Sequence, residues 1–485
     1  MIAPWVMDEM RGVDLKDARL NKRLGQVLSD LGDRPTLSIP AACGGHAEMT
    51  AAYRFFDNDK ATLDRILAPH RDATRRRTQS QDVALLVLDT TELDLTRPAQ
   101  QVAGAGPLAT DARCGLYLHL MQAFTVDGTP LGEVWSHVWT RDPESLKVPQ
   151  EDKRKARKAA PIEDKESFRW LEGLRHARAF AECCPTTKCV YVADSEADIY
   201  EVYAEARGDI NPIHWVIRLC QDRALAADDD PVASTGLIRA SVQAAPVLLT
   251  KEISVRGRAA KVACDDRQRR QPRKNRKAVV EVRATTLTLR PPHRSDRKLP
   301  AVTVHVVWVR EVDPPVDDVP VEWLLVTTLP IDTVEAVQTI LEYYTVRWMI
   351  EVFFRTLKSG CRVEARRFEH VDRVLVALSV YLIVTWRTLF VCRMSRSCPD
   401  LDCETVFEPA EWKSVWRAVR KVPLPETRPR LAEIVRLIAQ LGGYVNRPGR
   451  KDPPGPQTVW IGLQRMHDLA WAWDVFGPEA RGRDV

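Results

Sequence analysis

The chain lacks the features of a disulfide-stabilised or membrane-spanning protein. Its 11 cysteines are scattered without a CxxC pair, and their odd number argues against a disulfide framework. No charged-then-apolar leader opens the sequence, and the apolar stretch 374–386 is too short to cross a bilayer. A net charge of +5 is too small to define a partner by itself. We expect reduced thiols, a cytoplasmic location, no membrane contact, and a buried core helix over 374–386.

Basic residues nevertheless gather in three clusters. They occupy 75–77, 153–158 and 267–277, and in the last of these 7 of 11 residues are Lys or Arg. Single clusters of this kind are usually solvated loops, whereas several in one chain favour a polyanionic partner. The clusters therefore keep nucleic acid among the expected partners.

Residues 1–62 are predicted to form a helical unit. An apolar stripe at helical spacing is formed by Leu20, Leu24, Val27, Leu28 and Leu31. Arg19, Lys22 and Arg23 lie off that stripe, and a second helix over 47–56 follows a Pro- and Gly-containing break. Two short helices with basic residues suit a DNA-binding domain, and an ordinary helical N-terminal cap fits the same pattern.

Residues 63–372 are predicted to form an α/β domain. A hairpin around Asp127-Gly128 and a helix over 165–180 lie between two short apolar strands, 83–88 and 189–193. Period-two alternation predicts an antiparallel β insertion over about 225–320, followed by a strand returning to the core at 321–329. Residues 373–485 are predicted to be mostly helical.

Two carboxylates follow the two apolar strands directly. Asp89 comes after 83–88, and Asp194 comes after 189–193. Carboxylates at strand ends of an α/β sheet lie at an edge open to ligand on a rigidly held backbone. A turn or cap role for Asp89, and a helix-capping role for Asp194, fit the same positions.

A third carboxylate lies on a predicted helix with three other polar residues. At about 100° per residue, Tyr344, Arg347, Glu351 and Lys358 fall within an arc of roughly 60°. An apolar face is predicted opposite them from Val346, Met349, Ile350, Phe353 and Leu357. A solvated face with charges at helical spacing fits the stripe taken alone.

Three carboxylates around one cavity require cations to remain ionised together. Oxygen-only ligands suit Mg²⁺, with Mn²⁺ as a substitute. Two such ions about 4 Å apart activate a water or a 3′-hydroxyl on one side of a phosphorus and stabilise the leaving oxygen on the other. The pattern therefore indicates phosphodiester chemistry, with Arg347 and Lys358 holding backbone phosphates.

These motifs resemble those of the DDE transposases of the insertion-sequence-four family, the Tn-five group. The spacing of Tyr344, Arg347, Glu351 and Lys358 is similar to the family's YREK signature. LDTTELD and VADSEADIY resemble its two Asp motifs, and the first 60 residues resemble its DNA-binding region. The segments 431–447 and 455–469 resemble its C-terminal region, so the likeness covers nearly the whole chain.

The resemblance implies a ribonuclease-H-like core interrupted by the β insertion, and a C-terminal dimerisation domain over 373–485. It implies Asp89, Asp194 and Glu351 as metal ligands, with Tyr344, Arg347 and Lys358 contacting transposon-end DNA. It also implies cut-and-paste transposition by a homodimer on two inverted repeats, through nicking, a hairpin, and strand transfer into target DNA. Trp323 stands where the family has a tryptophan that receives a flipped base, although a core tryptophan fits as well.

Other candidates carry weaker expectations. Thr90 and Thr91 are expected to orient the first Asp, and Glu196 and Asp198 to support the metal ligands or to complement a helix dipole. Arg218 and Arg223 are expected to reach phosphate, unless they are ordinary surface arginines. Residues without an assigned role are His119, Lys165, Glu166 and Ser167.

Two competing functions remain open. One is a DNA-binding protein without chemistry, such as an inhibitor or a domesticated derivative of a transposase. The other is a nuclease that cuts without strand transfer. All three carboxylates and both cations of the stripe are present, which favours an active enzyme, and the terminal regions favour a transposase over a simple nuclease.

Overall fold

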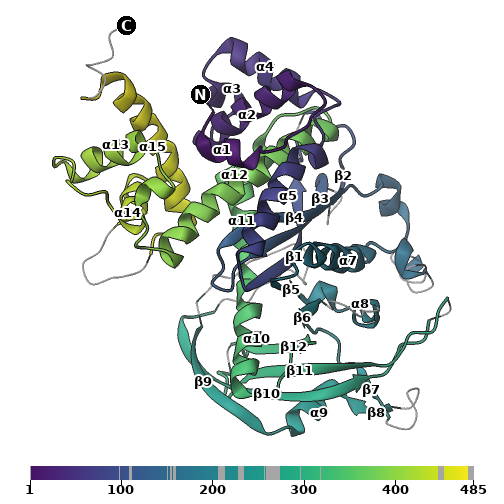
Figure 1. Cartoon of the computed structure of the whole chain (residues 1–485). Helices are drawn as coiled ribbons and strands as arrows, with labels where there is room; N and C mark the ends of the chain where they lie inside the picture. Colours follow the sequence, from purple (N-terminus) through teal and green to yellow (C-terminus); the bar gives the residue numbers. More distant parts are fainter. Residues whose placement is uncertain are drawn as a thin grey trace.

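The structure is a computed structural model of the chain (Figure 1). It describes residues 2–97, 99–108, 112–149, 151–152, 156, 160–205, 213–227, 234–255, 257, 273–294, 296–316, 318–445 and 453–478. The basic residues of the cluster at 153–158 lie outside these residues, and of the cluster at 267–277 only residues 273–277 are described.

Four helices make up the N-terminal unit, drawn in purple in Figure 1. They are α1 (Pro4–Glu9), α2 (Ala18–Asp33), α3 (Ile39–Cys43) and α4 (His46–Phe56). The Asp17 carboxylate caps α2 by accepting a hydrogen bond of 2.9 Å from the Arg19 N–H. Leu24, Val27, Leu28 and Leu31 of the predicted stripe are buried, and Leu20 is half-buried. The two predicted helices are therefore present, with α1 and α3 added beside them.

One mixed sheet runs through the middle of the molecule. Its first part contains β1 (Val83–Asp94), β2 (Gly106–Pro107), β3 (Cys114–Phe124), β4 (Pro130–Trp139), β5 (Lys188–Ala193) and β6 (His214–Arg218). The order β4-β3-β1-β5-β6 is antiparallel on the β3 side of β1 and parallel on the β5 side. Mixed α/β architecture with a large sheet is thus confirmed.

The predicted insertion strands extend this same sheet. They are β7 (Ala224–Ala226), β8 (Ser234–Leu237), β9 (Val247–Val255), β10 (Arg276–Leu289) and β11 (Val302–Glu311), with the short helix α9 (Ile238–Ala244) among them. The returning strand β12 (Glu322–Thr327) pairs antiparallel with both β6 and β11. Because β12 joins the two parts, backbone hydrogen bonds connect the insertion to β6 and onward to β1.

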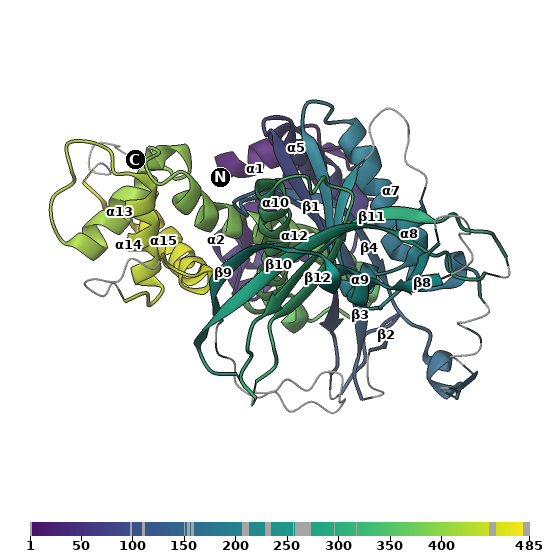
Figure 2. The same cartoon turned by 90° about the horizontal axis from the view of Figure 1, so that it is seen from below.

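Alternating residues of β1 separate two hydrophobic cores. Leu85 and Val87 belong to a core shared with α5 (Leu63–Gln79), α10 (Val334–Val346) and α11 (Trp348–Arg355). Leu86 and Leu88 belong to the opposite core, which includes Trp170 of α7 (Phe168–Glu182) and Tyr200 of α8 (Tyr200–Ala204). Figure 2 shows α5 and α10 on one side of the sheet and α7 and α8 on the other. This alternation decides which side chains near Asp89 face each other.

The helix α12 (Val371–Ser397) connects the central and C-terminal parts of the molecule. It is long and apolar enough to span a membrane by length and composition, but 83% of its most apolar window is buried inside the structure. The expected core helix over 374–386 is therefore confirmed as part of α12.

Three further helices form the C-terminal unit, drawn in yellow-green in Figure 1. They are α13 (Pro409–Arg420), α14 (Leu431–Leu441) and α15 (Pro456–Phe476). Gly462 lets α15 approach α14 closely, because an added Cβ would lie 1.9 Å from the Ile438 carbonyl oxygen.

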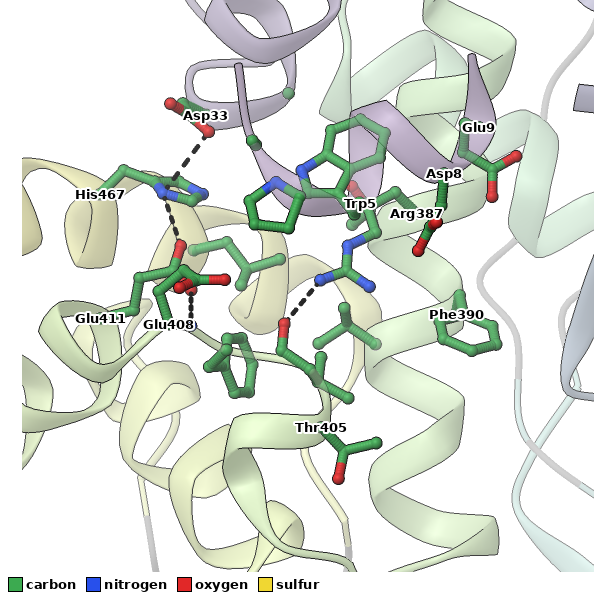
Figure 3. A pocket seen from close by; sticks show the side chains of 18 of the residues that line it. Trp5, Asp8, Glu9, Asp33, Arg387, Phe390, Thr405, Glu408, Glu411 and His467 are labelled. Carbon is green, nitrogen blue, oxygen red and sulfur yellow. Dashed lines mark hydrogen bonds and ion pairs between the residues drawn. The ribbon is translucent and has the colours of Figure 1, made fainter. Parts of the chain in front are cut away.

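A cavity of about 360 Å³ lies where the N-terminal and C-terminal units meet α12 (Figure 3). His467 of α15 lies 3.6 Å from the Asp33 carboxylate of α2 and 3.2 Å from the Glu411 carboxylate of α13. On the other side of the cavity, Arg387 of α12 donates a hydrogen bond of 2.8 Å to the Val406 carbonyl oxygen. The two terminal units are thus in direct polar contact.

Two expected elements differ from the structure. The strand β1 continues past Asp89 to Asp94, because β3 pairs with it along that whole length. The helix expected over the YREK stripe is interrupted at Arg347, whose N–H bonds to the Tyr344 carbonyl oxygen at 3.1 Å in an i to i−3 contact. It then ends in a π-helical turn, Thr356–Gly360. Asp89 is therefore an internal strand residue, and the stripe is not one straight helical face.

Candidate active site

Asp89 and Asp194 occupy matching positions on neighbouring parallel strands. The last register pair of β1 and β5 joins Leu88 to Ala193, so both aspartates come directly after it. Asp194 also caps the 3₁₀ turn Ser195–Ala197 by accepting a hydrogen bond of 2.8 Å from the Glu196 N–H. The expectation that two carboxylates meet at one sheet edge agrees with this register, and the capping role of Asp194 exists beside it.

Glu351 approaches from α11, on the side of β1 that carries the Asp89 side chain. Arg347 lies between them, with Nη1 3.2 Å from Asp89 Oδ2 and Nη2 2.7 Å from Glu351 Oε1. The side chains of Arg347 and Asp89 are only 14% and 13% exposed, so this ion pair is largely shielded from water. Arg347, at the junction of α10 and α11, and Asp89, where the parallel pairing ends, therefore meet at one point.

Electrostatics at this point favour an additional cation. Burial and the nearby charge of Asp194 together raise the pKa of the Asp89 carboxyl to about 8, against the opposing effects of Arg347 and of the Thr90 N–H. Burial also raises the pKa of Glu196, again with a contribution from Asp194. A carboxyl that is hard to ionise in this setting becomes a good anion when a cation binds beside it.

The donor atoms fit a hard divalent ion, but they are not yet gathered around one point. Carboxylate oxygens from Asp89, Asp194 and Glu351 are the ligand type that Mg²⁺ and Mn²⁺ prefer. Among the described residues, however, no three His, Cys, Asp or Glu side chains are grouped as a metal site. The chemistry of the donors fits the ion, while the arrangement shown holds a guanidinium between two of them.

The Thr90 hydroxyl does not orient Asp89. Thr90 donates its backbone N–H to Asp89 Oδ1 at 2.7 Å, while its hydroxyl lies on the opposite side of the strand and shares a hydrogen bond of 2.8 Å with His119 Nδ1. Burial holds the pKa of His119 well below its usual value. The neighbouring Thr91 hydroxyl makes a hydrogen bond of 3.5 Å with the Glu92 carbonyl oxygen. The Asp89 carboxylate is therefore held by Arg347 and by the Thr90 backbone N–H, and not by either threonine hydroxyl.

Arg169 is a residue of this region that the sequence did not single out. It donates to the Thr90 hydroxyl at 3.3 Å and to Glu196 Oε2 at 2.8 Å, and its guanidinium lies 5.3 Å from the Trp139 ring centroid. Glu166, which had no assigned role, pairs with Arg141 through two hydrogen bonds of 2.6 and 2.7 Å. In the sequence, the only signal for Arg169 is that a basic residue stands near the start of the helix predicted over 165–180.

Tyr344 and Trp323 lie together beside Arg347. Their ring centroids are 6.0 Å apart in an edge-to-face arrangement, and the Arg347 guanidinium lies 5.9 Å from the Tyr344 ring. Tyr344 is buried, and burial raises the pKa of its phenol despite the nearby charges of Arg347 and Arg218. Arg218 is exposed at the end of β6, and Trp323 is half-buried in β12.

Lys358 belongs to a different part of the surface from Arg347. It lies in the π-helical turn with its Nζ 3.7 Å from Glu364 Oε1, and Glu364 accepts a hydrogen bond of 3.0 Å from the Asp94 N–H. Burial lowers the pKa of the Lys358 ammonium, and Glu364 partly restores it. The charged residues of the stripe therefore lie near different parts of β1: Arg347 contacts Asp89, and Lys358 is linked through Glu364 to Asp94.

Asp198 and Arg223 form a largely buried ion pair, with side chains that are 0% and 12% exposed. Arg223 Nε donates to Asp198 Oδ1 at 2.9 Å, and Asp198 is 3% exposed. Since Arg223 already holds a buried carboxylate, its contacts favour a structural role over the expected phosphate contact. The same contacts give Asp198 a structural role in place of supporting a metal ligand.

The basic residues of α2 and α5 differ in how exposed they are. Arg19 and Lys22 are exposed on α2, and Arg23 is half-buried. In the first basic cluster, Arg77 is turned inward, where its Nη1 lies 2.6 Å from Glu9 Oε1. Arg19 and Lys22 are thus the most accessible cations among these four residues.

Three family models match the chain, in the order N-terminal, central and C-terminal, and leave residues 62–165 unmatched. "Transposase DNA-binding" matches residues 2–61, "Transposase DDE domain" matches 166–386, and "Transposase Tn5 dimerisation domain" matches 383–472. The second match includes Asp194 and Glu351 and begins after Asp89.

A solved structure with a remote likeness is a chain of the piggyBac transposase synaptic complex with hairpin DNA. It is 8% identical, with a TM-score of 0.36, and the match covers 78% of this chain and 66% of that one. This chain therefore spans slightly less than two thirds of the other's length.

Proposed function

The three family-model matches together support a Tn5-like DDE transposase, and from this premise we propose that the chain moves a DNA segment by cut-and-paste transposition. Its substrates are the inverted repeats at the two ends of the segment and the target DNA. The reaction comprises nicking, hairpin formation and reopening, and strand transfer. The observation that carries the proposal is the register that sets Asp89 beside Asp194, with Glu351 joined to Asp89 through Arg347.

We divide the chain for this purpose into 1–62 for DNA binding, 63–372 for catalysis and 373–485 for dimerisation. The strand order β4-β3-β1-β5-β6, antiparallel then parallel, supports a ribonuclease-H-like core. Two copies hold one DNA end each in a synaptic homodimer, a proposal supported by the dimerisation-domain match. The protein works on DNA in the cell interior.

Asp89, Asp194 and Glu351 hold two Mg²⁺ ions, or Mn²⁺ as a substitute. When bound, such ions activate the attacking oxygen and stabilise the leaving one. The buried position of Asp89 and its elevated pKa support its role as a ligand that needs a cation.

The DNA contacts are assigned to side chains around these carboxylates. Arg347 and Lys358 bind backbone phosphates on either side of the cut, and exposed Arg218 adds a third cation. Tyr344 positions Trp323, whose indole stacks on a base turned out of the helix at the hairpin step. Arg19 and Lys22, with Arg23 beside them, bind the repeat from the N-terminal unit.

Isosteric variants of the carboxylates test the proposal. Asp89→Asn, Asp194→Asn and Glu351→Gln should each abolish Mg²⁺-dependent cleavage of terminal-repeat DNA and leave binding largely intact in gel-shift assays. Asp82→Asn, an exposed aspartate before the other end of β1, is the matched control and should cut normally. Cleavage at the normal rate by any of the three variants contradicts the assignment. A wild-type chain that binds the repeat without cutting it supports the alternative, a silent inhibitor or domesticated derivative.

A further inference from the structure

The position of Arg347 has a consequence for metal binding that rests on the proposed function. Its guanidinium spans the space between Asp89 and Glu351, with one nitrogen on each carboxylate. A metal ion shared by these two carboxylates would have to occupy the same space. Metal and guanidinium are also both cations, so at such short separation in a shielded site they repel each other strongly.

The charges show why the guanidinium is held there in the absence of DNA. Asp89 and Glu351, with Asp194 nearby, form a concentration of negative charge, and Arg347 neutralises part of it. The two contacts come from different nitrogens of one planar fork, the geometry in which arginine binds paired oxygen acceptors well. The described residues show no assembled three-ligand site while this fork is in place.

DNA offers Arg347 an alternative anion. A backbone phosphate presents the same paired oxygen acceptors as the carboxylates, and the Tyr344 ring, 5.9 Å from the guanidinium, is also near the charge of exposed Arg218, a second cation for that phosphate. We propose that Arg347 is a built-in counter-ion that a DNA phosphate must draw away before Asp89 and Glu351 can share a metal ion. Arrival of the DNA end thereby opens the metal site, and the protein alone holds its metal weakly.

This coupling is reciprocal and measurable. If DNA raises the affinity for metal, metal must raise the affinity for DNA by the same factor. Coupling between sites commonly amounts to between about fivefold and 150-fold, and we expect about tenfold or more here.

The first experiment measures Mn²⁺ binding to the DNA-free protein by calorimetry. Arg347→Gln should bind Mn²⁺ about tenfold more tightly than the wild type, because the competing guanidinium is gone. Arg355→Gln removes the same charge from an exposed position of α11 and should bind Mn²⁺ like the wild type. In the double variant Asp89→Asn, Arg347→Gln the gain should disappear. Mn²⁺ affinity in Arg347→Gln that is equal to or below the wild-type value overturns the proposal.

A conservative variant guards against misfolding. The single ammonium of Arg347→Lys can hold only one of the two carboxylates, so its Mn²⁺ affinity should lie between those of wild type and Arg347→Gln. Circular dichroism melting establishes that each variant is folded. If Arg347→Lys and a folded Arg347→Gln both bind Mn²⁺ with wild-type affinity, the proposal is overturned.

The second experiment adds DNA, a duplex ending in the inverted repeat read from beside the gene. At saturating duplex, Mn²⁺ affinity should rise about tenfold in the wild type and stay unchanged in Arg347→Gln. An equal rise in both proteins would show that Arg347 is not the link. Neither experiment measures cleavage, so a protein with this coupling that cuts no DNA would refute the proposed function and leave the inference standing.

Discussion

Replacing Asp198 with Asn should loosen the loop after β6. Five donors converge on this one buried carboxylate: the Tyr203 hydroxyl, the Cys220 and Gln221 N–H groups, each at 2.8 Å, and Arg223 through Nε at 2.9 Å and through Nη2. The Asn amide keeps one acceptor oxygen, but its NH₂ group faces N–H donors from which it cannot accept a hydrogen bond. Arg223 is then a largely buried charge without a charged partner. Loss of one partner of a buried ion pair costs about 3 to 5 kcal/mol.

Hydrogen exchange measures this loss locally, which suits a chain with several units better than a single melting curve. Since about 1.4 kcal/mol corresponds to a factor of ten, amide protection over 219–223 should fall about 100- to 4,000-fold in Asp198→Asn. Asp222→Asn, a change at an exposed aspartate of the same loop, should leave the protection of Cys220 and Gln221 nearly unchanged. Unchanged protection in Asp198→Asn, together with weakened Mn²⁺ binding, would refute the structural role and restore a role beside the metal ligands.

Three other perturbations test separate parts of the structure. Burial disfavours charged His467, but Asp33 and Glu411 outweigh it and raise its pKa above the usual 6.5. Its contribution to stability is therefore complete below 6.5 and lost as pH rises through the folded pKa, so exchange protection of α15 should fall as pH rises above 6.5 in the wild type and show no such fall in His467→Gln. Trp323→Ala should slow hairpin formation on DNA that is already nicked, by roughly 1–3 kcal/mol of lost stacking, and normal hairpin rates would leave the indole a core residue. Lys358→Gln should reduce the slope of log affinity against log salt for repeat DNA by about one, and an unchanged slope would remove Lys358 from the phosphate contacts.

The neighbouring positions of Asp89 and Asp194 were predictable because each follows an unbroken apolar strand. Runs such as 84–88 and 189–193 are buried on both faces in a parallel sheet, and carboxylates that end them fall at one edge. The end of β1 was not predictable in the same way. Its polar continuation over 90–94 remains a strand because β3 pairs with it throughout, a long-range contact that its own composition does not reveal.

The partners of the charged residues were the least predictable feature. Helical spacing grouped Arg347 with Glu351, but the contact of Arg347 with Asp89 joins residues 258 positions apart. The π-helical turn that redirects Lys358 toward Glu364 has no periodic signal either. Asp198 resembled a helix-terminal charge because the loop that buries it comes more than 20 residues later.

The unbroken helix α12 determines how the N-terminal and C-terminal units are rotated relative to each other. Its 27 residues form a rod about 40 Å long that packs against α2 and α5 and also against α14 and α15 of the C-terminal unit. Inserting one residue in its middle would shift the far end by about 1.5 Å and rotate it by about 100°. Length changes here therefore alter the relative orientation of the terminal units in discrete steps, whereas the loops between α13, α14 and α15 can vary in length without turning one end against the other.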